Sequence, residues 1–291
     1  MDILDEATWA RRQAAHEARV DAWVQPHLAR RRTGTAHPVE DFLFTYYQQR
    51  PAALRRWHPG SGAGLEHATE HAEWKGYETA GGVTTVSAAH VASQAGLVRG
   101  LRALLAATAS RPAQLGCFGM HEWAMVYRLP HDDVRHASWP LRLGGVGTDR
   151  VVETHRVACS HFDAFRFFTP DARSRNVLQP GRDDRTDFEQ PGCLHAGMDL
   201  YKHAYRLSPM VASDLVADCF ELARDIRVLD MRASPYDLSG LGYRPVAVET
   251  PAGKQEYVAA QRRFAERAAP LRGRLVEECD RLLRQAVARP A

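Results

Sequence analysis

The residues best suited to chemistry lie within residues 189–206, where a histidine and an aspartate stand four positions apart. A Pro-Gly pair closes a long irregular segment, and the pattern then predicts a helix that begins near Leu194. On that helix His195 and Asp199 share one face, so the imidazole can be oriented, charged or bound to a metal. We expect this pair to open into the same buried hollow as the aromatic residues 37–60.

Residues 155–168 carry a second group of candidates. His161 and Asp163 alternate among four phenylalanines, and burial there would shift their pKa values toward those of working acids and bases. The alternative is that Asp163 only caps the helix that follows it. In the same segment, His155 and Cys159 stand four positions apart.

Residues 116–128 form a compact motif in which Glu122 could act as an acid or base beside His121. Neighbouring residues point about 100° apart on a helix, so both side chains cannot aim at one atom without help. The motif lacks the second histidine of an HExxH zinc site, which excludes that type of site. A core helix with its polar residues at the rim is the alternative.

Bulk composition describes an ordinary globular protein with one unusual feature. The chain has 291 residues and a formal net charge of +3, which permits nucleic acid as a partner without requiring it. Its 14 histidines are the unusual feature, although many could be core residues. The five cysteines have no close spacing, so neither a disulfide framework nor a zinc ribbon is indicated. Without a signal peptide or a long apolar run, we expect a cytoplasmic protein that does not bind membranes.

Hydrophobic spacing predicts helices through most of the chain. Residues 5–31 form the first, which Pro26 kinks or ends. Residues 37–60 form the second, interrupted by Pro51 and apolar over a wide arc, as in a buried central helix or the wall of a pocket for a flat ligand. Two short alternating runs around a Gly-Gly pair in residues 74–87 predict a β-hairpin.

The rest of the chain continues this helical pattern with two irregular segments. Residues 143–147 are glycine-rich but lead into a strand-like run, so they do not match a phosphate loop. Residues 169–193 are rich in proline, arginine and aspartate, which favours a lid or binding loop. Further helices are predicted over residues 88–107, 215–229 and 254–287. We therefore predict a mainly α fold, a single compact helical domain over residues 1–291 with a small β-hairpin.

Six stretches spread nearly end to end resemble one actinobacterial protein family, commonly labelled 3-methyladenine DNA glycosylase. They are HPVEDFLFTYY, RRWHPG, CFGMHEWAMVYR, SHFDAFRFFT, EQPGCLHAGMDLYK and LVADCFELARDIRVLDMRASPYDL. The resemblance implies a DNA-repair hydrolase, an N-glycosylase that removes alkylated purines such as 3-methyladenine from DNA without a cofactor. The chain has no helix-hairpin-helix loop of the kind found in one glycosylase class, so no catalytic residue is carried over.

A glycosylase needs an aromatic slot for the extruded base, a carboxylate that activates water or steadies the sugar cation, and cations for the flanking phosphates. The residues that could fill these roles are Tyr46, Tyr47 and Trp57 for the base, Asp199 or Asp163 for the carboxylate, and Arg55, Arg56 and Arg182 for the phosphates, with His195, His161 and Glu122 as further catalytic candidates.

A second resemblance is to helical haem-dependent aromatic oxygenases, which use a helix-borne axial histidine and in some cases a His-x-x-x-Cys haem attachment. His155 and Cys159 match that spacing, and His195 would be the axial metal ligand. This resemblance implies haem or iron as cofactor and a small aromatic molecule as substrate. The family label favours the glycosylase, whereas the residues alone favour the metal enzyme. A helical binding protein with solvated polar faces is a third hypothesis.

Overall fold

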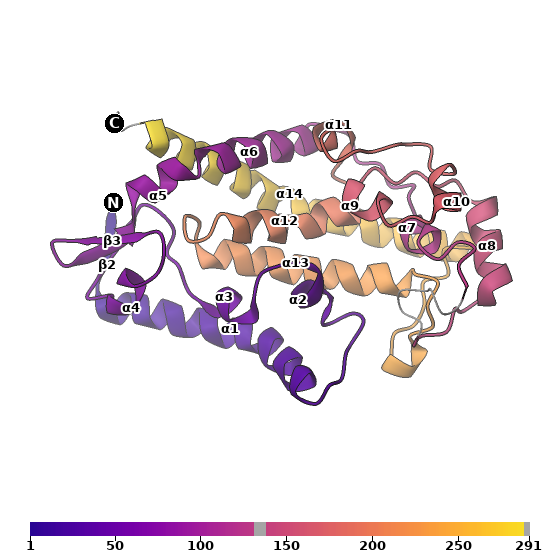
Figure 1. Cartoon of the computed structure of the whole chain (residues 1–291), viewed down its shortest axis with the longest axis horizontal. Coiled ribbons are helices and arrows are strands. Elements are labelled where there is room, and N and C mark those ends of the chain that lie inside the picture. Colours follow the sequence, from indigo (N-terminus) through magenta and orange to yellow (C-terminus); the bar gives the residue numbers. More distant parts are fainter. Residues whose placement is uncertain (131–137, 288–291) are drawn as a thin grey trace. The chain divides into compact units, whose positions relative to one another are not determined.

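Helices dominate the architecture, as their spacing in the sequence predicts. The computed structural model describes residues 1–130 and 138–287, and within these ranges it has fourteen α-helices and one small sheet (Figure 1). The prediction of a mainly α fold is therefore confirmed. None of the described helices is both long enough and apolar enough to cross a membrane.

The chain separates into two compact units, each built from segments far apart in the sequence. Unit 1 comprises Met1–Leu105, Leu200–Glu221 and Leu271–Ala291, and unit 2 comprises Ala106–Asp199 and Leu222–Pro270. The long helices α12 (Leu194–Arg206), α13 (Ser213–Arg232) and α14 (Pro251–Val287) each contribute residues to both units. A single domain over residues 1–291 stays a prediction.

The first helices of unit 1 differ from their predicted form. The helix α1 (Glu6–Arg32) continues through Pro26 instead of ending there. The aromatic helix expected over residues 37–60 is wrong, because this stretch holds only the short helices α2 (Phe42–Tyr46) and α3 (Pro51–Arg55). Arg50, just before the proline of α3, has an extended backbone, as the proline ring requires of the preceding residue.

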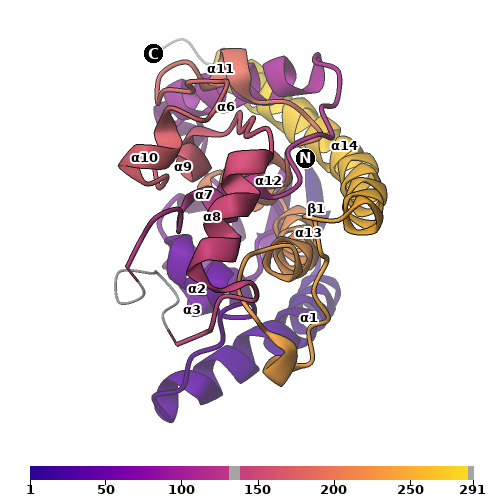
Figure 2. The same ribbon diagram turned by 90° about the vertical axis from the view of Figure 1, so that its right-hand side faces the viewer.

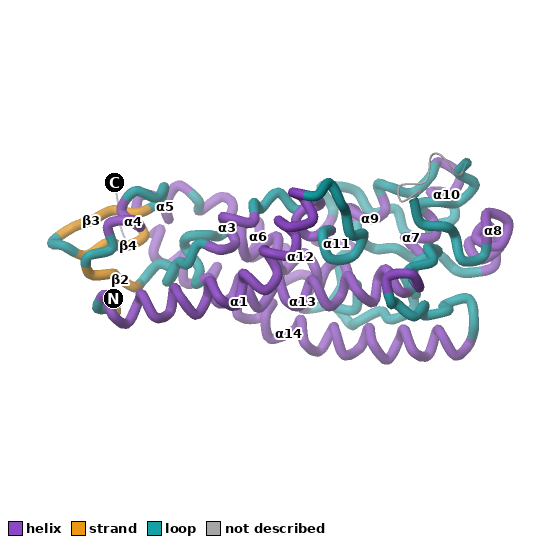
Figure 3. Tube along the Cα trace, turned by 90° about the horizontal axis from the view of Figure 1, so that it is seen from below, coloured by secondary structure: helices purple, strands orange, loops and turns teal. Residues whose placement is uncertain are grey.

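The sheet of unit 1 contains the predicted hairpin and two strands that were not predicted (Figure 3). Strands β3 (Tyr77–Ala80) and β4 (Val83–Val86) pair antiparallel across Gly81 and Gly82, and both glycines have the positive φ that a two-residue hairpin turn needs. Strand β2 (Ala63–Glu66) pairs with β4, and β1 (Asp2–Leu4) pairs parallel to β2. Both extra strands are too short to show a period of two.

Three more helices complete the described part of unit 1. They are α4 (Thr69–Ala72), α5 (Ala88–Ser93) and most of α6 (Ala95–Ala109). Trp57, Leu65 and Ala68 form a buried cluster against which Trp9 of α1 packs. The indole nitrogen of Trp9 donates a hydrogen bond to the carbonyl oxygen of Glu66 at 2.9 Å, which ties α1 to β2.

Unit 2 is built from short helices that pack around the ends of longer ones. Its own helices are α7 (Met120–Ala124), α8 (Gly144–Thr154), α9 (Phe162–Phe165), α10 (Pro170–Arg173) and α11 (Arg185–Phe188), with a 3₁₀ turn at Ser239–Leu241. Helix α8 packs against α7 (Figure 2). The glycine-rich segment and the first half of its strand-like run, residues 151–154, therefore form a helix, which corrects this part of the sequence prediction. The predicted lid segment contains α10 and α11.

Candidate metal centre

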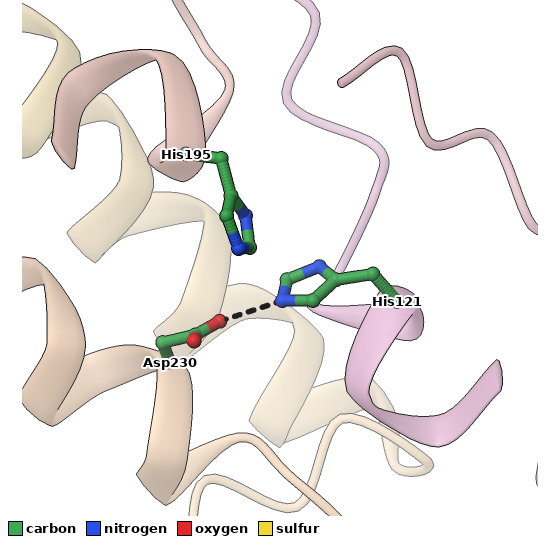
Figure 4. Close-up of side chains that lie close together, drawn as sticks. All are labelled: His121, His195 and Asp230. Atoms are coloured by element: carbon green, nitrogen blue, oxygen red, sulfur yellow. Dashed lines mark hydrogen bonds and ion pairs between the residues drawn. The ribbon is translucent and has the colours of Figure 1, made fainter. Parts of the chain in front are cut away.

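Three helices of unit 2 bring two histidines and an aspartate together (Figure 4). His121 lies on α7, His195 lies in the first turn of α12, and Asp230 lies near the end of α13. Each residue offers one ligand atom, and these atoms all lie within 4.8 Å of one another. The prediction that α12 begins at Leu194 is confirmed, and this start places His195 in the group.

The turn before α12 is held rigidly, which fixes the position of His195. The side-chain oxygen of Gln190 accepts hydrogen bonds from the backbone nitrogens of Gly192 at 2.7 Å and Gln114 at 2.8 Å. The amide of Gln261 donates to the carbonyl oxygen of Gly192 at 2.6 Å. A Cβ atom at Gly192 would lie 2.6 Å from the carbonyl oxygen of Gln114, so only glycine allows this close approach of two chain segments.

The three residues are buried and in direct contact. The Nε2 atom of His121 lies 2.8 Å from Oδ1 of Asp230, and these two atoms share a hydrogen bond. The rings of His121 and His195 meet edge to face, with centroids 4.4 Å apart. The exposed fractions are 5% for His121, 8% for His195 and 0% for Asp230. Within the described ranges no hydrogen bond holds the imidazole of His195, which leaves it able to bind a ligand.

Arg227 and Glu122 surround this group with further buried charge. One guanidinium nitrogen of Arg227 lies 2.6 Å from Oδ2 of Asp230 and 2.9 Å from Oε1 of Glu122. Burial opposes the charged form of His121, but the Asp230 carboxylate outweighs it and raises the pKa of His121. Burial, aided by the charge on His121, lowers the pKa of His195 well below its usual value. Burial therefore favours the neutral imidazole at His195, the form that binds metals, whereas the Asp230 carboxylate favours the charged form of His121, which must release its proton before it binds a metal.

A second buried network adjoins the first through His161. The rings of His161 and His195 have centroids 5.4 Å apart. The Nε2 atom of His161 lies 3.5 Å from Oε1 of Glu189 and 3.4 Å from Oδ2 of Asp199, and neither ring nitrogen forms a hydrogen bond. Arg185 pairs with Glu189 at 2.5 Å and with Asp199 at 2.9 Å. The carboxylate of Asp199 thus faces Arg185 and His161 and forms no hydrogen bond with His195.

A cavity of unit 2 leads toward the histidines. Its volume is about 430 Å³, and its wall includes Arg111, Arg156, Leu178 and Phe188. A smaller hollow of about 10 Å³, room for roughly one water, touches both His121 and His195. The two spaces adjoin at four residues that line both, here called the neck: Cys117, Ala158, Ser160 and Gln190.

No protein family model, curated protein or solved structure matches this chain. The resemblances drawn from the sequence therefore stay predictions.

The structure does not assemble the predicted ligand set of His195, His155 and Cys159. The Nδ1 atom of His155 lies 2.8 Å from the carbonyl oxygen of Val151 in its own helix, and His155 is not part of the buried ligand group. Residues 155–159 lie beyond the end of α8, so a spacing of four does not place them on one helical face. Cys159 does line the hollow beside His195, but burial raises the pKa of this thiol to about 12.

The remaining unit 2 candidates are dispersed. Asp163 lies in the first turn of α9, where it pairs with Arg166 at 3.4 Å. Arg182 is exposed on the segment before α11. Glu122 is buried and bound to Arg227, so it holds a charge in place and does not face the cavity as an acid or base.

The five substrate-binding candidates of unit 1 are mostly structural. Tyr47 and Trp57 are buried, with exposed fractions of 4% and 3%, so their rings fill the core of this unit. Tyr46 is half-buried and stacks on Phe42 of its own helix. Arg55 pairs with Glu17 at 2.8 Å and Asp21 at 2.9 Å on α1. Only Arg56 has its guanidinium in a cavity, where it lies over Trp74. That the His195 and Asp199 pair shares a hollow with this segment stays a prediction.

Sequence reasoning missed Asp230 and Arg227 and considered His121 only as a neighbour of Glu122. A signal was present, because Arg227 and Asp230 are two charges three positions apart inside the apolar run of α13. Charged residues are almost never fully buried unless they are paired. An arginine and an aspartate within a core-facing stretch therefore indicate a buried charged group.

Proposed function

We propose that this protein is a metal-dependent oxidoreductase that acts on a small aromatic molecule, with His121, His195 and Asp230 as the metal ligands. The observation that carries the proposal is the gathering of two imidazoles and one carboxylate within 4.8 Å at the end of a cavity. Two histidines and one carboxylate with open positions are the donor set typical of non-haem iron(II) oxygenases. A bound iron(II) ion would supply the site with redox chemistry at these open positions.

The distances between donor atoms fit a metal ion. The donor atoms of His121 and Asp230 are 2.8 Å apart. Two ligands at roughly 2.0–2.2 Å from one ion, with that separation, subtend an angle of about 85°, close to the right angle of an octahedral site. Arg227 binds the other oxygen of Asp230, which keeps Oδ1 directed at the site. The hollow at His195 is too small for a haem ring, so the proposal is for a single ion.

The cavity defines the class of substrate. A volume of about 430 Å³ lies in the range of small-molecule sites. The apolar side chains of Pro112, Leu178 and Phe188 suit an aromatic ring, and they exclude water from it. Arg156 is exposed at the same wall and can pair with an acidic group of the ligand. We therefore expect an aromatic acid whose ring points through the neck toward His121 and His195.

Metal analysis of the purified protein tests this proposal. We expect about one iron per chain after reconstitution with iron(II) under anaerobic conditions, and loss of that iron in His121→Ala and His195→Ala. The matched control is His155→Ala, which removes an imidazole of the same unit outside the ligand group and should retain the metal. A well-folded protein that binds no divalent metal would overturn the proposal, as would equal loss of iron in all three variants.

The predicted DNA-base N-glycosylase is the second candidate, and one observation favours it. The same cavity carries a carboxylate on Asp187, an aromatic ring on Phe188 and a cation on Arg156, which are the groups that base removal requires. Incubation with methylated duplex DNA should then release free 3-methyladenine, and Asp187→Asn should abolish the release. Release of the base by metal-free protein would favour this candidate, and absence of any release would remove it.

A further inference from the structure

A cavity in unit 1 has a concentration of positive charge that the proposed metal centre does not use. Its volume is about 320 Å³, and Arg56, Lys75, His90 and Trp74 are among its lining residues. No aspartate or glutamate belongs to the described residues that line it. All of these lining residues belong to unit 1.

The two permanent cations of this cavity lack carboxylate partners. The guanidinium of Arg56 lies over the ring of Trp74, with its carbon 5.1 Å from the ring centroid. Neither Arg56 nor Lys75 forms an ion pair within the described ranges, in contrast to Arg55, which binds two acids on α1. A cavity lined by unneutralised cations attracts an anion.

His90 also lines this cavity and forms part of its wall. The ring is held against Gly76, where a Cβ atom would lie 2.9 Å from Cδ2 of His90. Its Nε2 atom is enclosed by the protein, so the two cations, and not this atom, supply the binding groups of the cavity.

We propose that this cavity binds the phosphate group of a small phosphorylated molecule. A phosphomonoester carries close to two negative charges at neutral pH, which match the charges of Arg56 and Lys75. The guanidinium offers a planar fork that suits two phosphate oxygens, and Ser208 and Gln94 at the rim provide further donors. The remaining volume accommodates the organic part of the ligand.

Arg56 and Lys75 could also bind the phosphates of a nucleic acid. A small phosphomonoester and a nucleic-acid backbone differ in the negative charge that each phosphate carries. A backbone phosphodiester carries one negative charge and would leave one cation of the cavity unpaired. Nucleic-acid binding draws on many phosphates along a surface, whereas this site is one concave cavity with two permanent cations. A small phosphomonoester is therefore the ligand that the cavity favours.

Calorimetric titration of the intact protein at low ionic strength tests the proposal, since salt screens exposed charges. The probes are inorganic phosphate, glycerol 3-phosphate and undamaged duplex DNA. We expect saturable binding of the first two, weakened about tenfold or more by Arg56→Gln and by Lys75→Gln, because each removes a charged hydrogen bond. The matched control is Arg99→Gln, which removes an exposed cation of the same unit outside the cavity.

The possible outcomes separate clearly. Binding of the phosphate probes that only Arg56→Gln and Lys75→Gln weaken supports the site. Equal weakening by Arg99→Gln would show a diffuse charge effect and overturn it. Binding of DNA alone, or of no probe, would also overturn it. Phosphate bound at the metal centre of unit 2 would be unaffected by all three variants, which distinguishes failure of this site from failure of the proposed function.

Discussion

Buried histidines occur in both units, and His71 of unit 1 and His121 of unit 2 have different partners. In unit 1, His71 lies among aromatic rings, with Trp74 at a centroid distance of 4.4 Å, and its Nε2 atom lies 3.0 Å from the carbonyl oxygen of Trp57. In unit 2, His121 faces the carboxylate of Asp230, and His195 faces His121. A carboxylate partner alone does not mark a ligand, because the buried His27 of unit 1 also lies 2.8 Å from Asp41. The second imidazole beside the pair of His121 and Asp230 is what distinguishes the candidate ligand group.

The electrostatic surroundings of the buried histidines also differ between unit 1 and the ligand group of unit 2. Burial lowers the pKa of His16 and His71 and lowers that of His58 to about 3, so the folded state favours the neutral form of all three. Neutral imidazoles among aromatic rings pack as ordinary core residues. In unit 2 the imidazole of His121 faces the Asp230 carboxylate, and Arg227 pairs with both Asp230 and Glu122, so this group is charged and not apolar.

The largest expected effect separates metal binding from stability. Loss of an imidazole from the ligand group of unit 2 should remove the metal, whereas loss of His71 from the aromatic core of unit 1 should lower the free energy of unfolding. His195→Ala should remove the metal completely and cost the metal-free protein less stability than His71→Ala, because His195 is slightly more exposed and has no hydrogen bond to lose. His71→Ala should keep the metal but cost about 3 kcal/mol of unfolding free energy, because it leaves a cavity in a packed core. Metal analysis and urea unfolding with chelator present measure both. Metal loss in His71→Ala, in a variant that is still folded, would break the comparison.

The next largest effect concerns the charge that holds the two carboxylates of unit 2. Arg227→Met leaves Asp230 and Glu122 buried without their shared cation, and removal of one partner of such a group costs about 3–5 kcal/mol. Arg267→Met is the matched control, because Arg267 pairs with Asp225 at the surface, where the cost is about 1 kcal/mol or less. Chemical denaturation gives both values, and similar losses in the two variants would contradict a buried charged group.

Acid sensitivity should arise from the neutral histidines of unit 1. A folded-state pKa of about 3 for His58 lies below the unfolded value of 6.5, so the unfolded state binds a proton first and stability falls as pH drops below 6.5. The loss is about 1.4 kcal/mol per pH unit for each such histidine. Between pH 7 and pH 5, His58→Phe should therefore lose about 2 kcal/mol less than the unchanged protein. Parallel pH profiles of the two proteins would show that His58 titrates normally.

Elements with a local sequence pattern could be predicted, whereas elements that depend on packing or on distant partners could not. α12 and the residue 215–229 core of α13 were found because an apolar stripe repeats over several turns. The hairpin was found because a Gly-Gly pair readily adopts the positive φ angles that its turn requires. The strand-like run at the end of α8 was misread because valine and threonine favour strands unless packing decides otherwise. Strands β1 and β2 were missed because their partners lie far away in the sequence.

The candidate site could be predicted only in part, because it depends on contacts over long sequence separations. His195 was found from the turn and helix that surround it, which are local signals. Its predicted local partner Asp199 binds Arg185 instead, whereas the ligand Asp230 comes from another helix. A spacing of four residues tests only one helix, so it cannot select between partners that tertiary packing supplies.

The smallest expected effect is that of replacing His155, which belongs neither to the aromatic core of unit 1 nor to the ligand group of unit 2. Its imidazole is half-buried and lies against the end of its own helix, where Nδ1 is 2.8 Å from the carbonyl oxygen of Val151. His155→Ala should cost about 0.5–1 kcal/mol, the net value of one hydrogen bond, and should leave the metal content unchanged. Loss of the metal in this variant would restore the predicted pairing of His155 with Cys159 and displace Asp230 from the ligand set. Retention would support the ligand set of His121, His195 and Asp230.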